Sequence, residues 1–104
     1  MAKFVLAYRG GGMGSTPEEQ QKLMEAWMNW FGSLGDSVVD GGAPFGASST
    51  IASNGSVKDG GASTLTGYSI INADDLSGAN AKAKGCPVLT TGGSVEVYEA
   101  MPMG

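Results

Sequence analysis

A helix start signal directly after a strand pattern is the feature that most restricts the fold of this chain. Residues 3–9 alternate in character as a strand does, and a glycine run at residues 10–14 ends the pattern. Thr16 is a good N-cap, Pro17 suits the first helical position, and Glu19 completes a capping box. The sequence therefore predicts a strand followed closely by a helix that begins at Pro17.

This first helix is predicted to cover residues 17–34, because Gly35 is a natural residue to follow a helix end. Its large apolar side chains recur at spacings of four, three, one and three, which places on one stripe Leu23, Trp27, Trp30, Phe31 and Leu34. Aromatic side chains on such a stripe are more often core than pocket wall, and both interpretations stay open here. A buried indole N–H is expected to find a hydrogen-bond partner.

The rest of the chain alternates between strand and helix signals, separated by glycine-rich connections. In order, the patterns predict a strand at 37–40 ended by a glycine turn at 41–42, a long loop at 43–66 with a small two-residue hairpin at Asn54 and Gly55, a strand at 67–72, a short helix at 75–84 and a strand at 94–99.

This order predicts a single α+β domain over residues 1–104 with the ferredoxin-like split βαβ arrangement. Two helices are expected on one face of a four-stranded antiparallel sheet. Phe4, Leu6 and Ile70 are assigned to one face, whereas the other face receives Val5, Ala7, Ser69 and Ile71. Because two helices cover one face, the second apolar face predicts a partner, and we expect a homodimer that forms a dimeric α+β barrel.

Composition excludes several classes of partner. Six basic against ten acidic residues give a net charge of −4, which is the wrong sign for binding nucleic acid or an anionic membrane. The longest apolar run, residues 4–7, is too short for a membrane helix or a signal peptide. Cys86 is the only cysteine, so no disulfide within the chain is possible, and we expect a cytoplasmic protein.

The chain resembles the YCII-related family, also called YciI-like or DGPF-type proteins, which are small dimeric α+β barrel proteins. The resemblance covers nearly the whole chain, and its most specific part is the Gly-Tyr strand that leads into an Asp-Asp-Leu helix at residues 67–76. The other matching segments are residues 4–8, 16–19, 35–42, 86–87 and 92–97.

Two departures from the family pattern limit what the resemblance implies. Many members carry a histidine on the first helix that faces an aspartate of the second strand, but this chain has no histidine and places Met24 near that position. Some members carry Asp-Gly-Pro-Phe where this chain has Asp-Gly-Gly-Ala at residues 59–62. The resemblance therefore implies a role for the carboxylate of Asp40 alone.

Asp40 and Arg9 are the candidate chemical groups, because each lies at a predicted strand end before a glycine run. Asp40 would act as a general base if a pocket raised its pKa, and Arg9 would hold an anionic substrate. The alternative is a solvated carboxylate and a surface arginine. Trp27 and Met24 are the candidate ligand contacts on the helix, where the alternative is core packing.

No metal and no cofactor is expected. The chain lacks histidine and offers one thiol, so zinc and copper lose their usual ligands. The glycine loop has Ser15 where a dinucleotide fingerprint has its third glycine, which favours a flexible connection over a nucleotide site.

Two functions of different class follow from these observations. The first is binding of a small organic molecule in a pocket between the sheet and the first helix, with or without a lyase- or isomerase-like activity. The second is a non-catalytic dimeric module for interaction or regulation. The missing histidine favours the second, whereas Asp40, Arg9 and the aromatic helix favour the first.

Overall fold

The structure is a computed structural model that describes residues 1–12 and 14–103. Met13 of the predicted glycine loop and Gly104 lie outside the described residues. The elements are, in chain order, β1 (Ala2–Arg9), α1 (Pro17–Leu34), η1 (Gly35–Ser37), β2 (Val38–Pro44), β3 (Ser49–Ile51), β4 (Val57–Asp59), β5 (Leu65–Ala73), α2 (Leu76–Ala83), η2 (Pro87–Thr91) and β6 (Ser94–Ala100).

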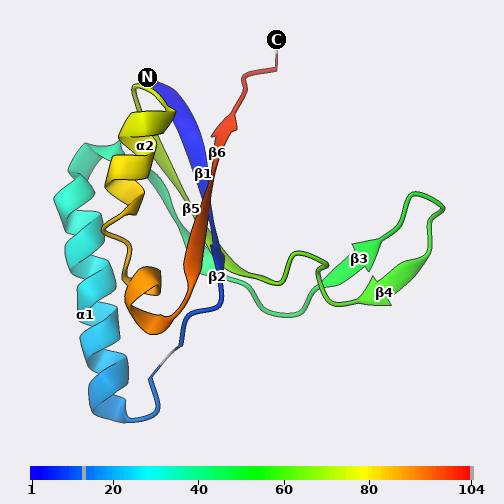
Figure 1. The fold of residues 1–104 in the computed structure, drawn as a ribbon, viewed down its shortest axis with the longest axis horizontal. Helices are drawn as coiled ribbons and strands as arrows, with labels where there is room; N and C mark the ends of the chain where they lie inside the picture. The colour runs from blue at the N-terminus through cyan, green and yellow to red at the C-terminus, as the bar shows by residue number, and fades with distance from the viewer. Residues whose placement is uncertain (13, 104) are drawn as a thin grey trace.

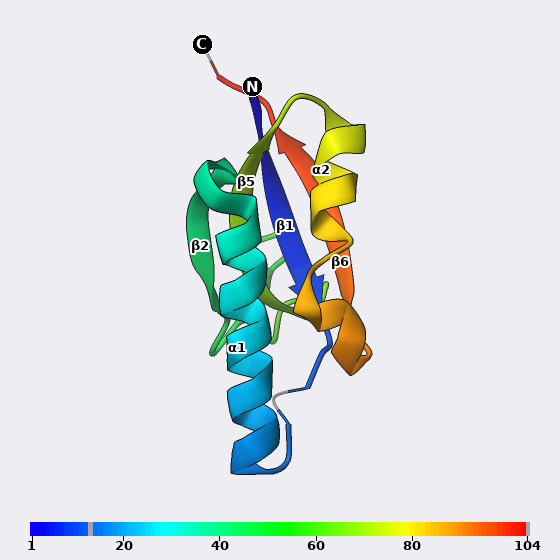
Figure 2. The same cartoon turned by 90° about the vertical axis from the view of Figure 1, so that its left-hand side faces the viewer.

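Four strands form one antiparallel sheet in the order β2-β5-β1-β6. Both helices lie on the same side of this sheet, and they run side by side across it (Figures 1 and 2). The predicted α+β class with a four-stranded antiparallel sheet and two helices is confirmed, and the strand order is compatible with the ferredoxin-like arrangement. No helix of the described residues is long and apolar enough to cross a membrane.

The first helix begins and ends where its sequence signals predict. The Thr16 hydroxyl accepts a hydrogen bond from the Glu19 backbone N–H at 3.1 Å, and Gly35 closes the other end with a left-handed φ of 55°. The reciprocal half of the capping box is shifted by one residue, because the Glu19 carboxylate accepts from the Ser15 backbone N–H. The hydrogen bonds that the Ser15 backbone N–H and hydroxyl donate to this carboxylate lower the pKa of Glu19.

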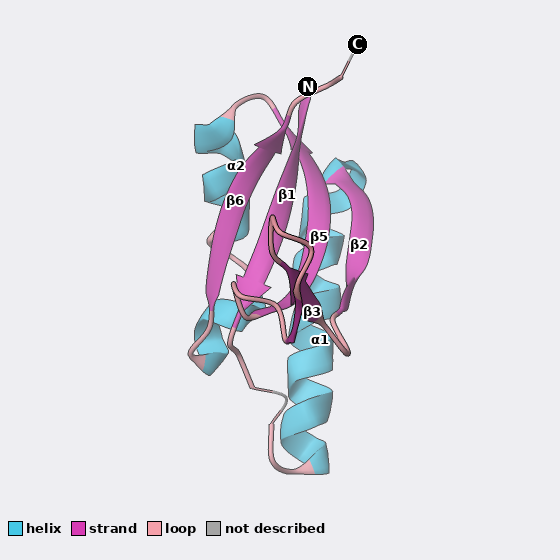
Figure 3. Ribbon diagram, turned by 90° about the vertical axis from the view of Figure 1, so that its right-hand side faces the viewer, coloured by secondary structure: helices cyan, strands magenta, loops and turns pink. Residues whose placement is uncertain are grey.

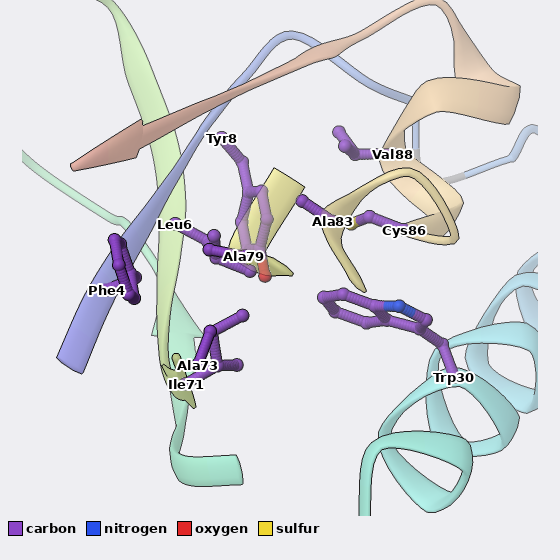
Figure 4. Close-up of a cluster of buried hydrophobic side chains, with 10 residues drawn as sticks. All are labelled: Phe4, Leu6, Tyr8, Trp30, Ile71, Ala73, Ala79, Ala83, Cys86 and Val88. Atoms are coloured by element: carbon purple, nitrogen blue, oxygen red, sulfur yellow. The ribbon is translucent and has the colours of Figure 1, made fainter. Parts of the chain in front are cut away.

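The core lies between the sheet and the helices. Alternate β1 side chains point into it, and they meet Ile71 from β5 and Trp30 from α1 (Figure 4). The Trp30 indole N–H donates to the Lys82 backbone carbonyl at 3.1 Å, so the expected partner of this buried group is present and joins α1 to the second helix. Cys86 is 1% exposed and packs in the same cluster.

The assignment of β5 side chains to the two faces was wrong. The register pairs Phe4 with Ile71 and Leu6 with Ser69, so Ile71 and Ser69 point toward the helices and are fully buried. Directly opposed residues of paired strands share a face. The face without helices, which we call the open face, is therefore built around Val5, Ala7, Tyr68, Ile70 and Tyr98.

The predicted end of the second strand at Asp40 was also wrong. β2 continues through Gly41 and Gly42 to Pro44, with register shifts on both sides of Asp40. Gly42 has a φ of 76°, and a Cβ atom there would lie 1.7 Å from the Tyr68 carbonyl oxygen. The two glycines thus form a bulge inside the strand, and at Gly42 the chain approaches β5 too closely for a side chain.

The predicted hairpin is present, with a longer loop than expected. β3 and β4 pair antiparallel, and Ile51 lies opposite Val57. The connection closes with a hydrogen bond from the Gly55 N–H to the Ala52 carbonyl at 2.8 Å, and Gly55 has a φ of 90°. The turn therefore needs one residue more than the two-residue type predicted from Asn-Gly. The hairpin projects from the open face, away from both helices (Figures 1 and 3).

The bulge gives a matched pair of substitutions. Gly42→Ala is expected to lower the free energy of unfolding by at least about 2 kcal/mol, because the methyl group meets backbone and the φ is left-handed. Gly41→Ala, where nothing lies within 4 Å of the added Cβ, is expected to change it by less than about 1 kcal/mol. Urea unfolding of both variants measures the difference, and equal effects would contradict this account of the bulge.

Candidate functional site

A cavity of about 540 Å³ lies between α1 and the sheet. We call it the helix–sheet cavity. Its volume is within the range of sites for small organic molecules, which is about 300–1,000 Å³. Its walls come from β1, the glycine loop, α1, β2, β5 and η2, and they consist of Tyr8, Gly10, Gly11, Gly12, Leu23, Trp27, Phe31, Gly41, Gly42, Ala43, Pro44, Phe45, Thr66, Gly67, Tyr68, Ser69, Val88 and Thr91.

Aromatic rings form the wall on the helix side. Trp27 packs edge-on against Tyr8 with ring centroids 5.2 Å apart, and it also contacts Trp30 and Phe31. Trp30 is buried, whereas Trp27 and Phe31 are half-buried and border the cavity. The apolar stripe of the first helix therefore contributes both to the core and to a pocket wall, the two alternatives considered from the sequence. Trp30 belongs to the core, whereas Trp27 packs against the core and also lines the cavity.

A chain of hydrogen bonds crosses three strands beside the cavity. The Tyr8 hydroxyl donates to the Ser69 hydroxyl at 2.7 Å, and Ser69 donates to the Gly41 carbonyl at 2.8 Å. Ser69 is fully buried, so both hydrogen bonds are needed to offset the loss of its contacts with water. Their effect is to fix β1, β5 and the bulge of β2 relative to one another at the cavity.

The polar side chains of the lining are already occupied. The Thr66 hydroxyl donates to the Gly10 carbonyl at 3.1 Å, and the Thr91 hydroxyl donates to the Val88 carbonyl at 3.2 Å. Among the described residues, no buried side-chain nitrogen or oxygen lacks a partner, and none of the residues lining the cavity is charged. Apolar surface is therefore what the walls offer an occupant.

Two titratable groups next to the cavity are held in their neutral forms. Burial raises the pKa of the Tyr8 hydroxyl, although its bond to Ser69 partly opposes this. Burial also raises the pKa of the Cys86 thiol from its ordinary value of 9.0 to about 11. Neither group is a base or a nucleophile near neutral pH, because each keeps its proton there.

Arg9 lies outside the helix–sheet cavity. It follows Tyr8 by one position in β1, so its side chain points to the open face. There it forms an ion pair with Glu96 at 3.8 Å and donates to the Thr64 hydroxyl at 3.3 Å. Both partners are partly solvated, so this ion pair contributes little to stability.

Asp40 and Met24 are also absent from the described lining of this cavity. Asp40 is paired with Ile70 and lies at the edge of the open face, where its carboxylate accepts from the Gly42 backbone N–H at 2.8 Å and from the Tyr68 hydroxyl at 3.4 Å. Met24 is 66% exposed on α1. Of the four candidate residues, the structure thus places only Trp27 at the cavity. The expectation that Arg9 and Asp40 border this pocket is not met.

Several lining residues were not identified from the sequence. Tyr8 has the same strand parity as Phe4 and Leu6, and that parity was a signal that it points toward the helices. The pair Gly41 and Gly42, close behind the two valines of the predicted second strand, was a signal for a bulge and a close approach. Phe45, in the long predicted loop, had no signal, because its position depends on stacking against Tyr68 at 5.7 Å.

Metal binding has no support in the described part of the chain, where no three His, Cys, Asp or Glu side chains come together. Compared with protein-family models and with curated proteins, the chain matches none. The function is therefore argued from the geometry of the cavity and of the open face.

The buried thiol gives a pH-dependent prediction. Between pH 9 and 11 the folded protein keeps the Cys86 proton that the unfolded chain releases. The contribution of Cys86 to the free energy of unfolding should therefore be complete below pH 9 and decrease toward pH 11. Urea unfolding at several pH values measures this, and Cys86→Ala should lose this component of the fall. A Cys86 that reacts with dithionitrobenzoate at pH 8 as fast in the folded as in the unfolded protein would contradict the burial.

Proposed function

We propose that this protein binds a small, neutral and largely apolar molecule in the helix–sheet cavity, and that it does so as a homodimer. The observation that carries the first part is a cavity of about 540 Å³ with aromatic walls and no charged lining residue among those described. We also infer a ferredoxin-like fold, which the strand order and the position of both helices support. That the protein is YCII-related rests on the sequence segments that resemble this family.

The chemistry of the walls selects the class of ligand. A charged molecule would lose its hydration without gaining a counter-charge, which is costly in an apolar site. A flat apolar molecule gains contact with Trp27, Phe31 and Tyr8, whose hydroxyl is already bonded to Ser69. Neutral aromatic or alicyclic compounds are therefore the class of ligand that this site fits best.

Binding rather than catalysis is the function proposed for the cavity. General acid–base catalysis requires a group that exchanges protons near neutral pH, and Tyr8 and Cys86 both hold their protons there. The predicted catalytic role of Asp40 stays a prediction, and its position on the open face lends it no support.

The ligand proposal is tested with N-phenyl-1-naphthylamine, a neutral probe that brightens in apolar sites. Its fluorescence should saturate at one probe per chain. Leu23→Trp, which adds bulk to the cavity wall, should weaken binding about fivefold or more, equivalent to roughly 1 kcal/mol. Met28→Trp, five residues further along α1 and on its exposed side, should leave the dissociation constant unchanged. No saturable signal, or equal effects of both variants, would sink the proposal.

The open face supports the homodimer. Val5 lies at its centre, flanked across the neighbouring strands by Ile70 and Tyr98. Two of the charged groups of this face are paired with each other, since Glu96 interacts with Arg9 and also accepts from Tyr98. A face whose centre is apolar and part of whose charge is already paired is suited to burial against a copy of itself.

The dimer predicts a mass of about 21 kDa by light scattering at micromolar concentration, which is twice the 10.5 kDa of one chain. Val5→Asp should dissociate it, because an unpaired charge in a packed interface is strongly unfavourable. Met28→Asp, which places the same charge on the exposed side of α1, should leave the mass unchanged. A folded protein of about 10 kDa would refute the dimer and leave the ligand proposal standing.

A further inference from the structure

The segment at residues 46–64, which contains β3 and β4, leaves the sheet between β2 and β5 and projects from the open face (Figure 3). We call it the arm. β3 and β4 make their main contacts with each other rather than with the sheet or the helices. Isolated two-stranded hairpins are marginally stable in water, so an arm of this kind gains stability from a second surface.

The reach of the arm restricts where that surface lies. The longest dimension of the protein is 43 Å, along the direction in which the arm projects. A helix layer packed on a sheet spans roughly 15 Å between Cα atoms, so the arm accounts for more than half of this length. Two facing sheets lie about 10 Å apart. The arm is therefore too long to end between two facing sheets, and it must pass an edge of the second one.

The arm carries an apolar face at its tip. Ile51 and Val57 are direct cross-strand partners and therefore point to the same side of the hairpin. They are 69% and 64% exposed. Lys58 lies on the opposite side, and with Asp59 it leaves the arm without net charge. A neutral arm meets no net repulsion from a chain whose own net charge is −4.

The open face alone is small for a lasting dimer. Four strands spaced about 4.8 Å apart and about eight residues long present roughly 500 Å² of flat area. A stable interface of standard size buries about 800 Å² on each partner. Because the accessible surface of a face with side chains exceeds its flat area, the open face comes near this size but does not clearly exceed it, and the arm is the described segment that projects on the correct side to add contact.

We propose that the arm clasps a second copy of this chain, with the face formed by Ile51 and Val57 lying on an edge strand, β2 or β6, of the other copy's sheet. The two arms exchange reciprocally about a two-fold axis, which is the geometry of an isologous interface and the commonest one between identical copies. This inference rests on the proposed dimer, since it needs the two open faces to meet.

The test compares dimer dissociation constants by sedimentation equilibrium. In an armless variant, Asn-Gly replaces residues 46–65, joining Phe45 to Thr66, which are already hydrogen-bonded at 2.9 Å. The dissociation constant of the dimer should rise at least tenfold in this variant. The double variant Ile51→Ser, Val57→Ser keeps the hairpin and should weaken the dimer at least fivefold, whereas Lys58→Ser should change it by less than twofold. The double variant decides the matter if the armless protein does not fold.

The outcomes separate the two proposals. An unmodified chain that is monomeric overturns the dimer and the arm together, whereas a dimer with unchanged affinity in both arm variants overturns the arm alone. Benzoylphenylalanine placed at Val57 identifies the surface directly. Light-induced crosslinks between copies, mapped to peptides of β2 or β6, support the clasp. Crosslinks confined to one chain, or formed only with another protein added from a cell extract, overturn it.

Discussion

The hydrogen bonds that run from Tyr8 through Ser69 to the Gly41 carbonyl hold the site together. They join three strands inside the protein, at the level where β2 bulges toward β5. Because Ser69 is fully buried, loss of either bond leaves a polar group without a partner, which costs about 1–3 kcal/mol. Tyr8, Ser69 and Gly41 all line the cavity, so its shape depends on this chain of bonds as well as on its aromatic walls.

The sequence predicted those parts of the fold that local chemistry determines. The helix at Pro17–Leu34 has its observed bounds because a hydroxyl cap, a proline and a terminal glycine each act within one turn. The sequence could not show which β5 side chains point toward the helices, because Ile70 and Ile71 are equally apolar. The pairing of β5 with β1 decides between them. The continuation of β2 was missed because two glycines indicate a turn or a bulge with equal force.

Predicting the site required knowledge of which face each strand end presents. Trp27 was found because helical spacing fixes its direction toward the sheet. Arg9 and Asp40 were chosen for their closeness to glycine runs, but one step along a strand reverses a side chain, and both lie on the open face. Phe45 stacks against Tyr68 only in the folded chain, and no local sequence pattern predicts this contact.

Phe45 has a position with a thermodynamic consequence. Phe45 is among the residues that line both the helix–sheet cavity and a second cavity of about 500 Å³ at the root of the arm. Two spaces that share a wall residue become coupled when an occupant of one selects an orientation of that side chain and so changes the free energy of filling the other. Such coupling is reciprocal and equal in both directions. A ligand in the aromatic cavity and a contact at the arm root therefore have one residue, Phe45, through which each can change the affinity of the other.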